Sequence, residues 1–136
     1  MPIFVQLSAQ NIITIHQNLS VVDDAPLEQG ILSIGLIEAA ANKPMIAVFG
    51  VEMYPTLEEK AASLILELCR IHAFVDGNKR TALAAGEVFL ILNGHRLEAG
   101  PYDKFRIIME CAKDNIDYGE MYDILCQWVR QKVRPI

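Results

Sequence analysis

Few of the features that mark membrane, secreted or nucleic-acid-binding proteins occur in this sequence. No apolar run approaches the ~20 residues that a membrane-spanning helix needs. The three cysteines (Cys69, Cys111, Cys126) form no CxxC pair and fall in apolar helical patterns, which predicts reduced core thiols rather than a metal or redox site. The net charge is −5, and the Lys and Arg residues are scattered instead of forming a basic stripe. We therefore expect neither a membrane nor a nucleic acid as a direct partner.

The 136 residues are enough for one domain with its own hydrophobic core. Hydrophobic residues make up 52% of the chain and charged residues only 21%, which predicts a compact, mostly buried fold. We see no internal repeat, low-complexity tract or linker, so residues 1–136 are expected to form a single domain. The chain begins Met1-Pro2-Ile3-Phe4-Val5 and then turns polar, with no basic region before a long apolar stretch, so we expect no signal peptide and a cytoplasmic location.

Apolar residues recur at helical spacing along most of the chain, which predicts an all-α bundle of about six helices. Ser8 can cap the first helix, and Asp24 or Ala25 leads into a second helix with Pro26 in its first turn. Residues 56–59 form a capping box, so a third helix is expected to begin there. The helices are expected over residues 9–19, 26–42, 56–71, 82–92, 103–113 and from 117 onward.

The arrangement of these helices follows from their apolar faces. Residues 82–92 are apolar on nearly every side, which places this helix in the centre of the bundle. His16 shares a helix face with apolar residues and is expected to pack rather than to bind a ligand.

The stretch Met45 to Met53 is rich in β-branched and aromatic residues around Gly50, which predicts a small β-hairpin. In the last helix, five residues are expected to point inward: Met121, Ile124, Leu125, Trp128 and Val129.

The nine residues from His72 to Arg80 carry the chemically most informative pattern. They form a loop that leads into a helix N-terminus, where free N–H groups and the helix dipole favour an anion. His72 could take a proton from an incoming hydroxyl, and Asp76 could hold Mg²⁺ together with substrate phosphates. Each residue also has a purely structural interpretation, since a histidine is favoured at a helix end and an aspartate often caps a helix.

The rest of this loop offers groups that suit a phosphate. Gly77 permits a positive φ and lets backbone N–H groups approach an anion closely. Asn78 could orient a phosphate or cap the helix. Lys79 and Arg80 supply a point charge and a planar fork, although adjacent cations are usually just solvated. Together, a base, a metal ligand, a glycine and two cations in one turn predict a site for a nucleotide phosphate.

The segment His72-Ala73-Phe74-Val75-Asp76-Gly77-Asn78-Lys79-Arg80 resembles the HxFx(D/E)GNGR signature of the Fic superfamily. It resembles more closely the death-on-curing (Doc) branch, in which lysine replaces the second glycine, as Lys79 does here. The likeness continues into the flanks, over residues 52–62 and 81–94. It implies a Fic/Doc-like bundle that uses ATP and Mg²⁺ to modify a protein hydroxyl. The roles it implies are a general base at His72, a Mg²⁺ ligand at Asp76, and phosphate or nucleotide ligands at Gly77, Asn78, Lys79 and Arg80.

The same resemblance implies how a target is bound and modified. The predicted hairpin matches the flap that holds a target segment in extended form by strand addition, with the residues Ile46, Ala47, Val48, Phe49, Gly50 and Val51. In Doc-like toxins ATP is held for transfer of its γ-phosphate, whereas the glycine form of the loop presents the α-phosphate. Lys79 therefore favours phosphorylation of a Ser or Thr, with elongation factor Tu as the expected target and arrest of translation as the result.

The resemblance also implies control by a partner. Many Fic proteins carry their own inhibitory [S/T]xxxE[G/N] helix, but the nearest such frame here, Ser63 to Glu67, is followed by Leu68 inside the predicted third helix. We therefore expect a separate antitoxin, whose helix docks in a groove near the site. Two alternatives stay open: an adenylyltransferase with the same fold, and a non-catalytic helical module that binds a partner.

Overall fold

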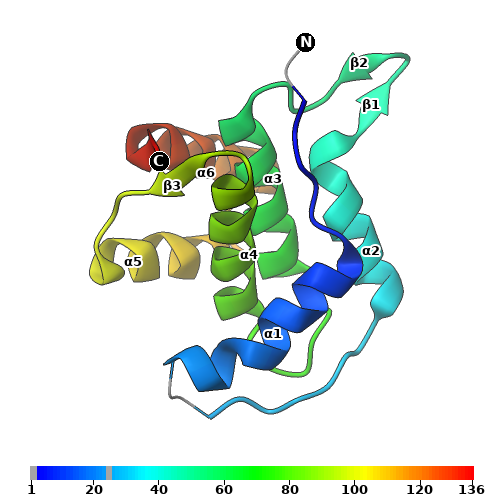
Figure 1. The fold of residues 1–136 in the computed structure, drawn as a ribbon, viewed down its shortest axis with the longest axis vertical. Helices are drawn as coiled ribbons and strands as arrows, with labels where there is room; N and C mark the ends of the chain where they lie inside the picture. The colour runs from blue at the N-terminus through cyan, green and yellow to red at the C-terminus, as the bar shows by residue number, and fades with distance from the viewer. Residues whose placement is uncertain (1–2, 24–25) are drawn as a thin grey trace.

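A computed structural model describes residues 3–23 and 26–136 of the chain, which form six α-helices and two small antiparallel sheets (Figure 1). The helices are α1 (Ala9–Asp23), α2 (Ile34–Asn42), α3 (Leu57–Arg70), α4 (Asn78–Leu92), α5 (Pro101–Cys111) and α6 (Tyr118–Lys132). The strands are β1 (Ala47–Val48), β2 (Val51–Glu52), β3 (His95–Leu97) and β4 (Val133–Pro135), and the 3₁₀ turn η1 (Lys43–Met45) follows α2. The predicted all-α bundle of about six helices is confirmed. None of the helices described is both long and apolar enough to cross a membrane.

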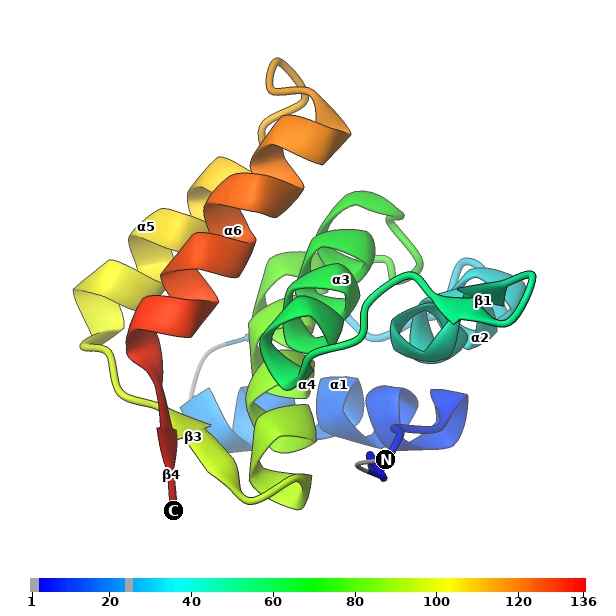
Figure 2. The ribbon, with the colours of Figure 1, turned by 90° about the horizontal axis from the view of Figure 1, so that it is seen from above.

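The core is built around α3 and α4, which lie side by side in the centre. Figure 2 shows α5 and α6 on one side of this pair, α2 on the opposite side and α1 beneath. Ten of the fourteen residues of α3 are buried, because the helix is covered on nearly all sides. The largest fully buried side chains of the two helices are Lys60, Leu64, Ile65, Leu66, Phe89 and Leu90. This packing fixes the ends of α3 and α4, and therefore the loop that joins them.

The central helix α4 differs from the prediction on one face. Its buried face packs against α3, as an apolar helix should. Its other face is only partly covered, and Leu83, Val88 and Ile91 line an open groove between α1 and α5. The apolar residues of α4 therefore serve two surfaces: one set packs in the core and the other lines this groove.

The second helix begins later than the sequence predicts. The prediction of a helix over residues 26–42 is wrong for residues 26–33, where the chain forms no helix. Gly30 has a φ of +143°, which an α-helix cannot contain, and the Ser33 hydroxyl accepts a hydrogen bond from the N–H three residues on, so Ser33 is the N-cap. The lead-in expected at Asp24 or Ala25 lies outside the described residues. Residues 26–33 instead contact the loop between α3 and α4.

Three smaller expectations also need correction. The helix expected over 9–19 continues to Asp23, and the helix expected over 103–113 is shifted to Pro101–Cys111, with Pro101 in its first turn. Ile124 of α6 is exposed rather than inward, whereas its four predicted partners are buried. A second sheet, in which β3 pairs with β4, was not predicted because its strands are 35 residues or more apart in the chain.

The expected caps and thiols are confirmed. Thr56 and Glu59 form a reciprocal capping box at the start of α3, and the Ser8 hydroxyl accepts the N–H of Asn11 in the first turn of α1. The three cysteines are buried and free. Burial raises the pKa of the Cys69 thiol to about 11 and that of Cys111 to about 12, so both are neutral, unreactive core groups at physiological pH.

The expected β-hairpin forms, and a buried lysine holds its base. Strands β1 and β2 pair through Val48 and Val51 and are joined by a two-residue turn. The Lys60 side chain is 0% exposed, and its Nζ donates to the Pro44 carbonyl at 2.9 Å and to Glu52 Oε1 at 3.0 Å. Because both acceptors are close, the buried ammonium is compensated. Lys60 therefore connects α3 to both sides of the hairpin.

We expect the substitution Lys60→Met to lower the free energy of unfolding by about 1–3 kcal/mol, because the Pro44 carbonyl and Glu52 lose their donor while the aliphatic part of the side chain is kept. Urea denaturation followed by circular dichroism measures this change. Lys113→Met removes an exposed ion pair with Glu110 and should cost less than about 0.5 kcal/mol. A Lys60→Met protein as stable as the parent would contradict the role given to this residue.

Candidate functional site

The loop between α3 and α4, residues 71–77, is closed by the side chain of Asn78. The N–H of Phe74 donates to Asn78 Oδ1 at 3.0 Å, and Asn78 Nδ2 donates to the Phe74 carbonyl at 2.9 Å. The Phe74 ring is buried in the core. The amide side chain of Asn78 is thus used inside the loop, which leaves its backbone N–H as the group that can face a ligand. We refer to residues 71–77 as the motif loop.

His16 of α1 contacts the motif loop through both its ring face and its Nε2 atom. Its side chain is 2% exposed, and its ring stacks on Phe74 with 4.0 Å between centroids and 7° between planes. Its Nε2 lies 2.7 Å from the Asp76 carbonyl oxygen. Since a carbonyl oxygen can only accept, Nε2 carries a proton and donates. The prediction that His16 packs is confirmed, but its bond to a residue 60 positions away has no signal in the sequence.

Residues 26–33 also hold the motif loop, through backbone hydrogen bonds. The N–H of Val75 donates to the Gly30 carbonyl at 3.1 Å, and the N–H of Leu32 donates to the Ala73 carbonyl at 2.7 Å. A Cβ atom on Gly30 would lie 2.7 Å from Val75 Cγ2, so only glycine permits this approach. The two segments therefore form a short antiparallel pairing. Residues 26–33, which were wrongly predicted to be helical, are thus the residues that support the motif loop.

The Asp76 carboxylate is fixed by backbone donors. Its Oδ2 accepts the N–H of Glu28 at 3.1 Å and its Oδ1 accepts the N–H of Gly77 at 2.8 Å. These two hydrogen bonds, that of Glu28 first, hold the pKa of Asp76 below its usual value of 3.8, so the group is ionised at neutral pH. The carboxylate is exposed, and each oxygen keeps a lone pair. It does not cap α4, so the simple capping role is excluded for this aspartate.

This carboxylate fits Mg²⁺ better than a metal that requires several protein ligands. Among the residues described, no group of three or more His, Cys, Asp or Glu side chains is arranged to hold a metal ion. Mg²⁺ is commonly bound through one or two carboxylates plus water and substrate phosphates. A single fixed carboxylate beside the uncapped N-terminus of α4 matches that pattern.

The start of α4 has no side-chain cap. Gly77 is the N-cap residue with a φ of +79°, and the first backbone bond of the helix runs from Thr81 to Gly77. The N–H groups of Asn78 and Lys79 have no acceptor within the described part of the chain. A Cβ atom on Gly77 would lie 2.4 Å from Leu27 Cδ1, so the close packing of the loop requires glycine. The free N–H groups and the helix dipole favour a phosphate here.

His72 occupies a strained position at the opposite end of the motif loop. It follows Ile71, the C-cap of α3, and has a φ of +50°, in the left-handed region that glycine or asparagine usually occupies. For a residue with a Cβ atom, this conformation raises the free energy by about 1 kcal/mol. The imidazole is exposed. A residue that keeps this strain without packing in the core is a candidate for a chemical role.

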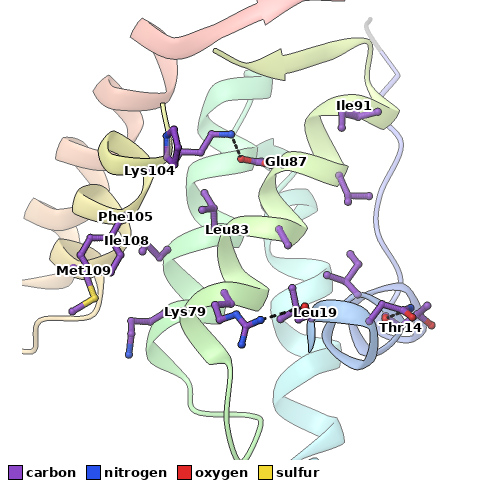
Figure 3. Close-up of a pocket in the computed structure, with 16 residues that line it drawn as sticks. Thr14, Leu19, Lys79, Leu83, Glu87, Ile91, Lys104, Phe105, Ile108 and Met109 are labelled. Atoms are coloured by element: carbon purple, nitrogen blue, oxygen red, sulfur yellow. Dashed lines mark hydrogen bonds and ion pairs between the residues drawn. The ribbon is translucent and has the colours of Figure 1, made fainter. Parts of the chain in front are cut away.

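The two cations diverge from the start of α4. Arg80 Nη2 donates to the Leu19 carbonyl of α1 at 3.2 Å. Lys79 is exposed and lines the groove between α1, α4 and α5 (Figure 3), which has a volume of about 820 Å³. Most of the groove is apolar, and one ion pair crosses it from Glu87 Oε1 to Lys104 Nζ at 2.7 Å. Lys79 therefore lies between the start of α4 and an apolar groove.

The hairpin is far from His72. It leads into the N-terminus of α3, whereas His72 follows the C-terminus, and Figure 1 shows them at opposite ends of this helix. With 14 residues at a rise of 1.5 Å each, α3 is about 21 Å long. The structure thus brings His72, Asp76 and Gly77 into one loop, with Asn78, Lys79 and Arg80 in the first turn of α4 beside it. It does not bring the hairpin residues 46–51 to them.

Two comparisons with known proteins identify the family of this chain. Residues 6–90 match the Fic/DOC family, and this match covers more than half of the chain, so the chain belongs to the Fic/DOC family. A stretch of 65 residues is 54% identical to the protein named Toxin Doc of Mycolicibacterium smegmatis. That similarity covers 48% of this chain and 50% of the Mycolicibacterium protein, so this chain spans about half the length of the relative it matches. The family expected from the loop and its flanks is confirmed.

We expect His16→Phe to keep the ring stacked on Phe74 but to lower the free energy of unfolding by about 1–2 kcal/mol, because the Asp76 carbonyl loses its buried donor. Hydrogen exchange of the motif loop amides should become faster than in the parent. His95→Phe is the matched control, since within the described residues the His95 ring bonds only to the Asn93 carbonyl, two positions before it. Unchanged exchange of the loop in the His16→Phe protein would show that this hydrogen bond does not hold the loop.

Proposed function

We propose that this protein is the toxin of a toxin–antitoxin pair and transfers the γ-phosphate of ATP to a Ser or Thr hydroxyl of a target protein. Elongation factor Tu is the expected target, so that translation in the cytoplasm would be arrested. Family membership and the similarity to a protein named Toxin Doc support this proposal. The observation that carries it is the joint placement of the Asp76 carboxylate and the uncapped N-terminus of α4 in one rigid loop, with the exposed His72 at its other end.

The phosphates of ATP would be held by groups at the start of α4. The N–H groups of Asn78 and Lys79 bind phosphate oxygens, and the Arg80 guanidinium offers a planar fork for them. Asp76 would hold Mg²⁺, which supplies charge neutralisation and alignment of the phosphates. Because the loop is fixed before ATP binds, these contacts cost little reorganisation.

His72 would act as the general base. Its imidazole takes the proton of the target hydroxyl, whose oxygen forms a bond to the γ-phosphorus. The bond between that phosphorus and the oxygen bridging to the β-phosphate breaks, and ADP leaves with the electron pair. The exposed position of His72 allows a protein hydroxyl to reach it from solvent.

Lys79 supports γ-phosphate transfer over adenylylation. In the family's glycine form the loop has no side chain at this position and ATP presents its α-phosphate, whereas this chain carries an ammonium group on the second residue of α4. The added bulk and charge favour the Doc type of reaction. Adenylylation remains the alternative that the experiment below distinguishes.

The partner proposed for this toxin is a separate antitoxin. The groove beside Lys79 is lined by apolar side chains of three helices, which suits the apolar face of an amphipathic helix. The inhibitory frame Ser63 to Glu67 cannot act in cis, because Ser63 is buried in α3 and donates to the Lys60 carbonyl. These two observations support inhibition by a helix from another chain.

The proposal is tested with ATP carrying the label on the α- or the γ-phosphorus, incubated with this protein, Mg²⁺ and purified elongation factor Tu. We expect label on the target only from γ-labelled ATP, and a loss of more than about 100-fold in rate for His72→Ala, as is typical when a general base is removed. His95→Ala, the control, should transfer at the parental rate.

Each other outcome is informative. Transfer of the α-label would establish an adenylyltransferase and overturn the kinase proposal. If neither label reaches the target, although the ATP and the elongation factor are shown to be active, a non-catalytic binding module is favoured. Transfer by His72→Ala at the parental rate would refute the assignment of the base.

A further inference from the structure

We infer that two copies of this protein associate through the exposed face of the hairpin, residues 46–53, with Phe49 at the tip of one hairpin entering a cavity at the base of the other. The inference does not depend on the proposed reaction, because the hairpin and the motif loop lie at opposite ends of α3 (Figure 1). The contact between the two copies is therefore distant from both motif loops.

One face of the hairpin is apolar and exposed. Successive side chains of a strand point to opposite faces, so the cross-strand pair of Val48 and Val51 shares its face with Ile46 and Met53. The Met53 N–H donates to the Ile46 carbonyl at 3.0 Å, which extends the pairing by one residue on each side. Each of these four residues is between 42% and 69% exposed, and the charged Glu52 lies on the opposite face. Because a lone two-stranded hairpin is marginally stable, an uncovered apolar face indicates a contact with another molecule.

The tip of the hairpin presents a large aromatic ring. Phe49 and Gly50 have φ angles of +50° and +78°, and two positive φ angles are characteristic of a type I′ turn. Such a turn favours asparagine or glycine at its first central position, because these residues reach a positive φ most easily. Phe49 adopts this unfavourable conformation although no side chain of the described residues covers its ring, which is fully exposed. The ring is therefore placed for burial against a second molecule.

The base of the hairpin is anchored to the core. Lys60 donates to the Pro44 carbonyl on one side of the hairpin and to Glu52 on the other. The Lys60 ammonium also lies 5.1 Å from the centre of the Phe4 ring, which belongs to the N-terminal segment. A segment that is fixed before binding loses little conformational freedom when it binds. The hairpin therefore presents Phe49 at a defined position.

A cavity of about 660 Å³ opens beside the base of the hairpin. It is lined by Met53 and Tyr54, which follow β2, and by residues of α6 that include Tyr122. The Tyr54 and Tyr122 rings are stacked with 5.5 Å between their centroids. Met53 belongs both to the apolar face and to the cavity wall, so the two surfaces are continuous. Aromatic and thioether walls suit a phenyl ring, so the cavity fits Phe49 of a second copy.

A two-fold arrangement of two copies uses both surfaces at once. When two hairpins stack face to face in opposite directions, the tip of each lies over the base of the other. The path from Phe49 to Met53 is about 13 Å at 3.3 Å per residue, and it is the same in both copies. Each Phe49 ring therefore meets the cavity of the other copy, and the contact closes as a symmetric dimer.

The size and charge of the face favour a second copy as the partner. Phe49 exposes roughly 200 Å², and if the four other residues add about half as much each, a pair buries roughly 1,200 Å², the lower limit of a specific interface. Residues 44–51 include no charged residue, so two copies with a net charge of −5 each can meet here without close like-charge contacts. We therefore expect a weak dimer that forms as the concentration rises.

Sedimentation velocity of the full chain tests this association. We expect the parent to dimerise with a dissociation constant between about 1 μM and 1 mM. Phe49→Asn removes the ring and gives the turn the Asn-Gly pair that type I′ turns prefer, so the hairpin should be retained. This substitution should raise the dissociation constant at least about tenfold, as is typical for an aromatic residue at the centre of an interface.

The control is Tyr102→Asn, which removes another exposed ring, from α5, and should leave the dissociation constant unchanged. A parent that stays monomeric up to about 1 mM overturns the inference. Dimerisation of Phe49→Asn with the parental dissociation constant overturns it as well.

Hydrogen exchange locates the contact independently of any variant. We expect the amides of residues 46–53 to exchange more slowly as the concentration of the parent rises. Protection confined to the groove between α1, α4 and α5 would place the contact there and contradict the inference. Protection of the hairpin only after elongation factor Tu is added would assign the hairpin to the target, and this result would contradict the inference too.

Discussion

The hydrogen bond from His16 to the Asp76 carbonyl is the constraint on which the site depends. It crosses from α1 to the motif loop at 2.7 Å and is shielded from water, because the His16 side chain is buried and stacked on Phe74. In such surroundings a hydrogen bond is strong and a missing partner is costly. The bond fixes the backbone of Asp76, and through it the direction of the carboxylate. The helix α1 therefore acts as a support for the loop rather than as a separate part of the bundle.

Most polar groups of the motif loop are hydrogen-bonded within the chain. Asn78 bonds the backbone of Phe74, and residues 26–33 bond Ala73, Val75 and the Asp76 carboxylate. What is left without a partner in this described region is the pair of backbone N–H groups of Asn78 and Lys79 at the start of α4. A loop whose other polar groups are paired is preorganised for the anion that the proposed function requires at this point. The strained His72 lies at its far end.

Local signals explain what the sequence predicts well. The capping box at Thr56, the cap at Ser8 and the turn signals of the hairpin act within a few residues, and all three are present in the structure. Contacts between distant segments explain the errors. Helical spacing over residues 26–33 is overridden by Gly30 and by pairing with the motif loop. Lys60 is buried with its ammonium bonded to Pro44 and Glu52 at the base of the hairpin. The site residues were located by their types and order, whereas the support from His16 required the fold.

We propose that the Asp76 carboxylate holds the metal of a nucleotide site in the motif loop. It is tested by calorimetric titration of the imido analogue of ATP into the parent and into Asp76→Asn, with and without Mg²⁺. Asparagine keeps the shape of the side chain but loses the charge that binds the metal. We expect Mg²⁺ to strengthen binding to the parent by at least about tenfold and to have little effect on the variant. Equal enhancement by Mg²⁺ in both proteins, or no binding to the parent, would contradict it.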